Sequence, residues 1–287
     1  MKHNLIGISG KIGSGKDTVG LMISYLAWKK TILDKGLIDE SMLVDYKDFS
    51  GKYLAESQFQ IKKFGGKLKE IAGLLIGCTE EDFEDREFKE KELGKEWWFY
   101  VSSLFPGGEM YPYINASEET HNNTGLYLIK LTPRKILQLL GTECGREIIH
   151  PNIWVNALFA NYIARPKGKA HDLQDMSELY SGKTCDNCGI TFSGYKRQPY
   201  CKKCTEDDSV QIYPNWIITD MRFPNELEAV KSRGGLTIRV NLIGNEDTGD
   251  HESETALDDA SFDVTINAEF GLDKLLQKVN EQIIPLL

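Results

Sequence analysis

A glycine-rich segment near the start of the chain constrains its fold more than any other feature. It runs from Gly10 to Thr18 and reads GKIGSGKDT. The apolar stretch from Leu5 to Ser9 precedes it and predicts a buried strand, and apolar residues at helical spacing then predict a helix over 18–30. Because a helix N-terminus with free backbone N–H groups binds phosphate oxygens, this order predicts an α/β fold with a phosphate-binding loop.

The loop fits the pattern G-x-x-x-x-G-K of the P-loop NTPases, with one departure. Asp17 stands where a Ser or Thr is usual, and Thr18 follows it. We expect Lys16 to reach the β- and γ-phosphates of a nucleotide, and Thr18 or Ser14 to supply the hydroxyl that magnesium needs. Asp17 could hold the metal through water or help to position an acceptor. The loop therefore predicts nucleotide binding but leaves the reaction open.

The acidic composition limits the partners of the chain. Its 287 residues carry a net charge of −9, and its pI is about 5.2. Such a chain repels the backbone of nucleic acids, so we expect no polymeric nucleic acid as a partner. No run of eighteen apolar residues and no signal peptide occur, which predicts a protein of the cytoplasm without a membrane span.

Strands alternate with helices along the chain, which favours a parallel sheet with helices on both faces in a single domain over 1–287. Further strands are predicted near 59–61, 216–220, 236–242 and 262–266. Further helices are predicted over 68–76, from 132 onward, and over 152–163, 225–233 and 272–283. The Pro-, Gly- and Asn-rich stretch 105–125 is predicted to be a long surface loop.

A polar insertion over 165–210 contains four of the six cysteines. They form two C-x-x-C pairs, Cys185 with Cys188 and Cys201 with Cys204. Four thiolates suit tetrahedral zinc and leave no open position, so we predict a structural zinc site that resembles a zinc ribbon, with a redox pair as the alternative. The insertion is either a stapled surface element or a nucleic-acid site that uses its lysines and tyrosines.

Cations elsewhere in the chain are candidates for holding an acceptor phosphate. Phosphoryl transfer needs alignment and charge neutralisation more than covalent chemistry, and arginine suits phosphate oxygens. The candidates are Lys69, Arg134, Arg146 and Arg222. Arg222 follows a predicted strand that ends on Asp220, at the sheet edge where ligands bind in open α/β folds. Asp220 could orient magnesium-bound water or an arginine.

Several short segments together form a more specific pattern. In chain order they are GKDT at 15–18, KLKE at 67–70, TPR at 132–134, QLLGTE at 138–143, Arg146, WVN at 154–156, WIITDMRFPNE at 216–226 and HESE at 251–254. In this order they resemble the bacteriophage deoxynucleoside monophosphate kinases. The resemblance covers most of the chain outside the insertions.

This resemblance implies a nucleoside monophosphate kinase-like fold with a five-stranded parallel sheet, and ATP with magnesium as co-substrates. It implies transfer of the γ-phosphoryl group to a deoxynucleoside monophosphate, and it is compatible with a homodimer. The implied ATP-binding residues are Gly13, Ser14, Gly15, Lys16, Asp17 and Thr18. The implied acceptor-binding residues are Lys69, Arg134, Gly141, Thr142, Arg146, Trp154, Asp220, Arg222 and Glu226.

Some of these assignments leave alternatives open. Trp154 either stacks on a base or sugar or packs in the core, and Glu226 either fixes Arg222 or the base edge or is a carboxylate favoured in the first turn of a helix. The acidic loop 244–259 has the place of a lid but no arginine, so Arg239, Arg134 or Arg146 must neutralise the transferred group. Alternative functions are a kinase for another small phosphorylated acceptor and a nucleotide-regulated binding module that uses the zinc ribbon.

Overall fold

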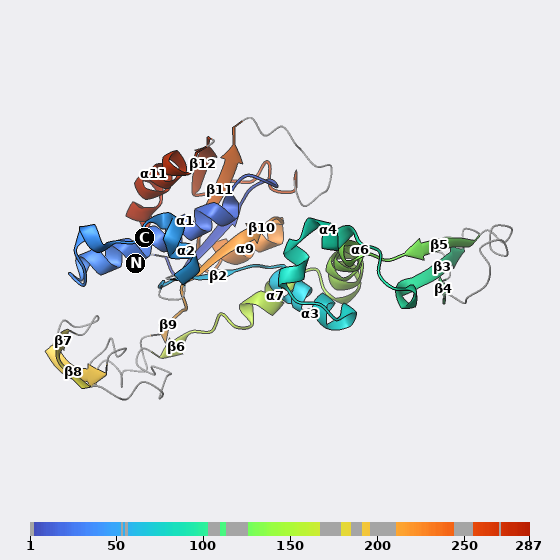
Figure 1. Cartoon of the computed structure of the whole chain (residues 1–287), viewed down its shortest axis with the longest axis horizontal. Coiled ribbons are helices and arrows are strands. Elements are labelled where there is room, and N and C mark those ends of the chain that lie inside the picture. Colours follow the sequence, from blue (N-terminus) through green and yellow to red (C-terminus); the bar gives the residue numbers. More distant parts are fainter. Residues whose placement is uncertain are drawn as a thin grey trace. The chain divides into compact units, whose positions relative to one another are not determined.

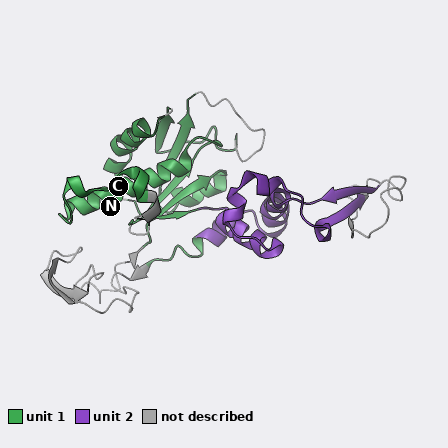
Figure 2. Ribbon diagram, in the orientation of Figure 1, with its two compact units in different colours: residues 1–62, 159–287 green, residues 63–158 purple. Residues whose placement is uncertain are grey.

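The computed structural model describes residues 3–52, 54, 57–102, 110–112, 126–166, 179–184, 191–195, 211–243, 255–269 and 271–287. The chain divides into two compact units, which Figure 2 shows in different colours. Unit 1 comprises residues 1–62 and 159–287, and unit 2 comprises residues 63–158.

Unit 1 is built on a five-stranded sheet in which every neighbouring pair is parallel (Figure 1). Its strands are β1 (Leu5–Ser9), β2 (Gln60–Lys62), β10 (Trp216–Met221), β11 (Leu236–Leu242) and β12 (Val264–Ala268). Their order is β12-β11-β1-β10-β2, which confirms the predicted five-stranded parallel sheet. Because β1 is central, the winding of the chain reverses beside it, and the crevice at such a point is where ligands bind.

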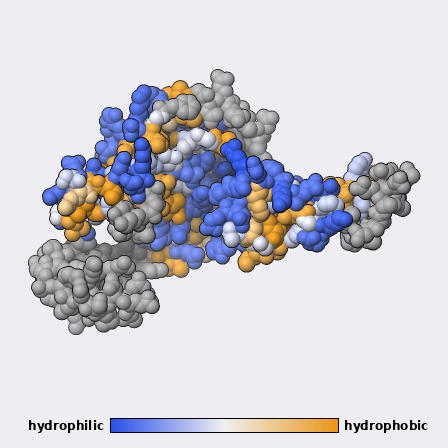
Figure 3. All heavy atoms as spheres, in the orientation of Figure 1, coloured by the Kyte–Doolittle hydropathy of each residue, from blue (hydrophilic) through white to orange (hydrophobic). Residues whose placement is uncertain are grey.

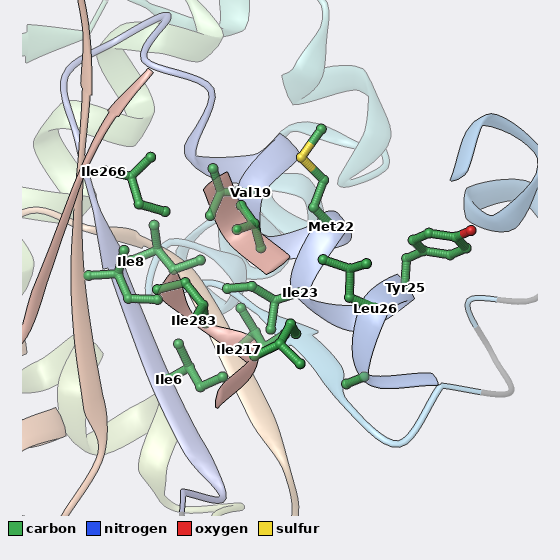
Figure 4. Close-up of a cluster of buried hydrophobic side chains, with 14 of the residues drawn as sticks. Ile6, Ile8, Val19, Met22, Ile23, Tyr25, Leu26, Ile217, Ile266 and Ile283 are labelled. Carbon is green, nitrogen blue, oxygen red and sulfur yellow. The ribbon is translucent and has the colours of Figure 1, made fainter. Parts of the chain in front are cut away.

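Helices cover both faces of this sheet, which explains why every residue of β1 is buried. The helices and 3₁₀ turns of unit 1 are α1 (Lys16–Asp34), η1 (Glu40–Met42), α2 (Tyr46–Lys52), α9 (Pro224–Lys231), α11 (Leu272–Gln282) and η6 (Ile284–Leu286). Ile6 and Ile8 join the apolar cluster with α1 and α11 that Figure 4 shows. Gly7 points to the other face, where a Cβ atom would lie 3.1 Å from Val230 of α9.

Unit 2 combines short helices with a small antiparallel sheet. Its helical elements are α3 (Gly66–Ile76), η3 (Glu81–Glu84), α4 (Arg86–Glu90), η4 (Lys95–Trp97), α6 (Pro133–Gln138), the π-helix η5 (Leu139–Ile149) and α7 (Ile153–Phe159). The strands β3 (Trp98–Ser102), β4 (Met110–Pro112) and β5 (Leu126–Lys130) have the order β4-β3-β5. Thr132 caps α6 as predicted, because its Oγ1 accepts from the backbone N–H of Lys135 at 3.2 Å.

The small sheet of unit 2 corrects the prediction of a continuous surface loop. Met110–Pro112 is a strand paired with β3, and the rest of the interval 105–125 lies outside the described residues. Helix α7 is also shorter than the predicted 152–163, since it ends at Phe159. A separate apolar cluster holds unit 2 together around Ala72, Phe83 and Ile136.

Only short parts of the insertion are described. They are the pair β6 (Arg165–Pro166) and β9 (Gln211–Ile212) and the hairpin β7 (Leu179–Thr184) and β8 (Thr191–Tyr195). The four cysteines of the predicted zinc site lie outside the described residues, as do 244–254 of the predicted lid. The described residues contain no group of His, Cys, Asp or Glu arranged to hold a metal.

The described surface is mixed in character. In the view of Figure 3, hydrophilic residues dominate and are interspersed with smaller apolar areas. No described helix has both the length and the apolar character that crossing a membrane requires.

Candidate active site

The phosphate-binding loop connects β1 to α1 at the carboxyl edge of the parallel sheet. Gly13 and Gly15 have φ values of 75° and 85°, which residues with a Cβ atom rarely adopt. The loop also closes on itself, because the backbone N–H of Ser14 donates to the carbonyl oxygen of Lys11 at 3.1 Å. A Cβ atom on Gly10 would lie 2.3 Å from Ser14 Oγ, so glycine is required there as well. The loop therefore has the conformation that the sequence predicts.

Two side chains of the loop are buried in positions that suit a phosphate ligand. Lys16 is 8% exposed, and its Nζ donates to the carbonyl oxygen of Lys11 at 3.3 Å. The buried Ser14 Oγ has no hydrogen-bond partner among the described residues. Since a buried hydroxyl without a partner is costly, Ser14 Oγ is suited to bind a metal ion or a phosphate oxygen. These groups fit a magnesium nucleotide.

Asp17 is held in place by the neighbouring strand. Thr219 of β10 is fully buried, and its Oγ1 donates to Asp17 Oδ1 at 2.6 Å. Asp17 itself is exposed, Thr18 follows it in a half-buried position, and Asp220 is half-buried directly after Thr219. The carboxylate that replaces the usual hydroxyl of the motif is thus fixed at the first turn of α1. No pattern in the sequence singles out Thr219 as the partner of Asp17.

Glu226 lies in the first turn of helix α9 and caps the N-terminus of that helix. Its Oε2 accepts from the backbone N–H of Arg222 at 2.7 Å and of Phe223 at 3.1 Å, and Glu226 is 2% exposed. A carboxylate in the first turn that bonds back to the N-terminus is a standard helix cap. This geometry favours the capping alternative for Glu226, and the cap also fixes the backbone of the half-buried Arg222.

Arg239 lies at the base of the phosphate-binding loop. It pairs in register with Ser9 at the end of β1 and donates from Nη1 to Ser9 Oγ at 3.0 Å. Its Nη2 donates to Asp258 Oδ1 at 2.6 Å, and Asp258 Oδ2 lies 3.3 Å from Lys11 Nζ. This arrangement places one of the arginines considered for charge neutralisation beside the loop.

In unit 2, the predicted acceptor cations Lys69 and Arg134 each pair with a glutamate. Lys69 Nζ donates to Glu84 Oε1 at 2.5 Å, and Arg134 Nε donates to Glu90. Partial burial lowers the pKa of Lys89, and the positive charges of Arg134 and Lys69 lower it further. These five residues, here called the cationic cluster, have a surplus of positive charge.

The charges of the cluster also affect Glu84. Burial alone would raise the pKa of Glu84, but the hydrogen bond and the charge of Lys69, together with Lys63 and Lys89, lower it below its ordinary value. Glu84 therefore stays ionised and neutralises part of the positive charge. An anionic ligand that replaced a glutamate here would find the same lysine and arginine donors.

The remaining acceptor candidates of unit 2 lie on or against η5. Gly141 is buried in η5, and Thr142 and Arg146 are half-buried in the same helix. Trp154 is 5% exposed, and its Nε1 donates to the carbonyl oxygen of Gly141 at 2.9 Å. This geometry favours the packing alternative for Trp154.

The candidate residues are therefore distributed over both units. Unit 1 contains the phosphate-binding loop together with Asp220, Arg222 and Glu226, and unit 2 contains Lys69, Arg134, Gly141, Thr142, Arg146 and Trp154. Sequence reasoning missed Lys89, Glu84 and Glu90. All three lie in the charged stretch 80–96, but charge alone does not identify which residues meet.

A glycine loop with a buried lysine, placed after the central strand of a five-stranded parallel sheet, is the arrangement typical of P-loop nucleotide-binding proteins. No family model matches the chain. It is 25% identical over 282 residues to the deoxynucleoside-5'-monophosphate kinase of Escherichia phage T5, an alignment that covers 88% of this chain and 84% of the relative. This similarity confirms the resemblance to the phage deoxynucleoside monophosphate kinases, and with the fold it supports a nucleotide kinase function.

Proposed function

We propose that the protein is an ATP-dependent deoxynucleoside monophosphate kinase that produces a deoxynucleoside diphosphate and ADP. The observation that carries the proposal is the phosphate-binding loop, in which Lys16 and the Ser14 hydroxyl are buried beside two glycines of positive φ. The similarity to the T5 kinase supports a deoxynucleoside monophosphate as the acceptor.

The donor side uses the loop to hold and neutralise the phosphates of ATP. Backbone N–H groups of the loop and the Lys16 ammonium bind the β- and γ-phosphate oxygens, and the N-terminus of α1 adds its positive dipole. Magnesium, when bound, would neutralise further phosphate charge. Ser14 or Thr18 would hold it through a hydroxyl, and Asp17 directly or through water.

The acceptor needs no strong base. Its phosphate has a second pKa of about 6, so near pH 7 it is mostly a dianion and already a nucleophile. One of its oxygens attacks the γ-phosphorus, the bond to the bridging oxygen breaks, and ADP leaves with the electron pair. The cations of the cluster, Lys69, Lys89 and Arg134, supply the charge that holds such a dianion, with Glu84 and Glu90 as the counter-ions that it displaces.

The test is a coupled assay of ADP release with each of the four deoxynucleoside monophosphates. Turnover with at least one is expected, and none with any would contradict the proposal. The same screen with other phosphorylated acceptors separates this function from the alternative kinase.

Arg134→Ala tests the acceptor side separately. Because a charge-assisted hydrogen bond contributes about 1.5–3 kcal/mol, we expect the KM for the acceptor to rise roughly 10- to 100-fold, with little change in the KM for ATP. Lys130→Ala is the matched control, since Lys130 is a cation of unit 2 that pairs with Glu92 outside the cluster. An unchanged KM for the acceptor would remove Arg134 from the site.

The structural zinc is a separate proposal. Metal analysis of the purified chain should find about one zinc per chain, bound by the four thiolates. A stable chain free of metal would exclude it.

A further inference from the structure

Asp258 connects two cations beside the phosphate-binding loop. Its Oδ1 accepts from Arg239 Nη2 at 2.6 Å, and its Oδ2 lies 3.3 Å from Lys11 Nζ. Lys11 belongs to the loop itself, directly after Gly10. The carboxylate of Asp258 therefore joins the loop to the turn that begins at Thr255, which is the described end of the predicted lid 244–259.

The two cations differ in burial and in the number of contacts that hold their side chains. The Arg239 side chain is 11% exposed, bonds to both Asp258 and Ser9, and lies 5.8 Å from the ring centroid of Phe262. The Lys11 side chain is 27% exposed and meets Asp258 at 3.3 Å. A longer ion pair of a flexible, partly exposed lysine contributes little, so Lys11 can leave Asp258 at small cost while Arg239 stays.

The charges at this position also favour an anion. Lys11 and Arg239 share the carboxylate of Asp258, so among the described residues these three side chains together carry one net positive charge next to the loop. A triphosphate in the loop carries several negative charges and would compete with Asp258 for Lys11. Since a phosphate attracts an ammonium group more strongly than a single carboxylate does, Lys11 would move to the phosphates.

We propose that Lys11 is a further donor-binding residue, held by Asp258 in the nucleotide-free protein and transferred to the triphosphate on binding, while Arg239 retains Asp258. This inference rests on the proposed function. Asp258 is then a positioning residue whose ion pair with Lys11 opposes nucleotide binding. Of the two ion pairs that Asp258 makes with Arg239 and Lys11, the pair with Lys11 is lost when the donor binds.

The experiment measures the Kd of a non-hydrolysable ATP analogue with magnesium by calorimetry. Lys11→Ala should weaken binding. Asp258→Asn removes the competitor for Lys11, so the analogue should bind about two- to five-fold more tightly, the range that a weak surface ion pair gives. The same variant should have a lower Tm without nucleotide, because Arg239 loses a partner. A purely structural role would lower both Tm and affinity, whereas competition changes them in opposite directions.

Two controls make the test specific. Asp259→Asn removes the same charge from the exposed neighbour, and it should leave the Kd close to that of the wild type. In the Lys11→Ala background, Asp258→Asn should no longer tighten binding, since the competing pair is already absent. Weaker binding of Asp258→Asn, or equal tightening in both backgrounds, would overturn the inference.

The outcomes for this inference and for the proposed function are distinct. If the wild-type protein binds no analogue, the proposed function is contradicted. If the wild type binds the analogue but Asp258→Asn does not tighten this binding, only the competition between Asp258 and the triphosphate for Lys11 is contradicted. If Asp258→Asn does not fold, Lys11→Ala and Lys11→Arg decide. Alanine should weaken binding without changing Tm appreciably, and arginine should restore it. Unchanged binding of Lys11→Ala would refute the role of Lys11.

Discussion

Replacing Thr219 with Val removes one hydroxyl from β10 while keeping the branched shape of the side chain. Thr219 is fully buried, and its Oγ1 donates to Asp17 Oδ1 at 2.6 Å. The Thr219 Cγ2 atom lies close to α1, since a Cβ atom on Gly20 would approach it to 2.6 Å. The substitution therefore removes this hydrogen bond to the Asp17 carboxylate without opening a cavity between strand and helix.

The expected loss of stability is modest. Hydrogen bonds to charged groups contribute about 1.5–3 kcal/mol, but Asp17 is exposed and water can replace the lost donor, which reduces the cost to about 1 kcal/mol. For a unit of this size that corresponds to roughly 2–4 °C in Tm. The effect on turnover should be larger, because misplacing a group at the reacting phosphates costs about 10- to 100-fold in kcat.

Thr237→Val is the matched control. Thr237 is also a fully buried strand residue, and its Oγ1 donates to Asp263 Oδ2 at 2.7 Å outside the candidate site. Thermal denaturation and steady-state kinetics at several magnesium concentrations should show a Tm loss for both variants, larger for Thr237→Val because its Oγ1 also accepts from the backbone N–H of Asp263 at 3.1 Å, and a fall in kcat for Thr219→Val alone. If both variants keep normal kcat and magnesium dependence, the bond to Asp17 only stabilises the fold.

Three further predictions concern single contacts. Lys16→Ala should abolish turnover with an unchanged circular dichroism spectrum, and normal turnover would refute the phosphate-binding loop. Trp154→Phe should lose about 1 kcal/mol of stability in urea denaturation, because the Nε1 bond to Gly141 disappears; a large rise in the acceptor KM at unchanged stability would instead favour base stacking. Burial alone would raise the pKa of Asp263, but hydrogen bonds from Thr237 lower it, so the wild type should lose stability as pH falls below about 4 and Thr237→Val should lose less. An equal loss in both would contradict that assignment.

The parallel sheet and its loop could be predicted because local sequence specifies them. Leu236–Leu242 is a strand with the predicted bounds, and the glycines of the loop have the positive φ that their positions require. The order of the strands could not be derived from periodicity, since any strand with a continuous apolar run can lie next to any other. The resemblance to known kinases implied the number of strands and their parallel direction, whereas their order comes from the folded chain.

Other features depend on contacts between distant residues. The strand Met110–Pro112 lies in a stretch whose Pro, Gly and Asn content predicts a loop, and its pairing with β3 overrides that local preference. The helix from Thr132 was predicted from its cap, but its change to a π-helix at Leu139 has no sequence signal that we recognise. The partners Asp258 and Thr219 are 247 and 202 residues from Lys11 and Asp17, respectively, so only the folded chain brings them together.

The aromatic contact between Tyr162 and Tyr213 has a consequence for the history of this chain. Tyr162 precedes the cysteine-containing insertion 165–210 and Tyr213 follows it, and their rings stack with centroids 5.1 Å apart. Because these two residues are in contact, a segment between them can be inserted or removed without straining the sheet. The entropic cost of closing such a loop rises only slowly with its length. An insertion at this point can therefore be gained or lost while the parallel sheet and the phosphate-binding loop keep their structure, and natural variants can differ in length here.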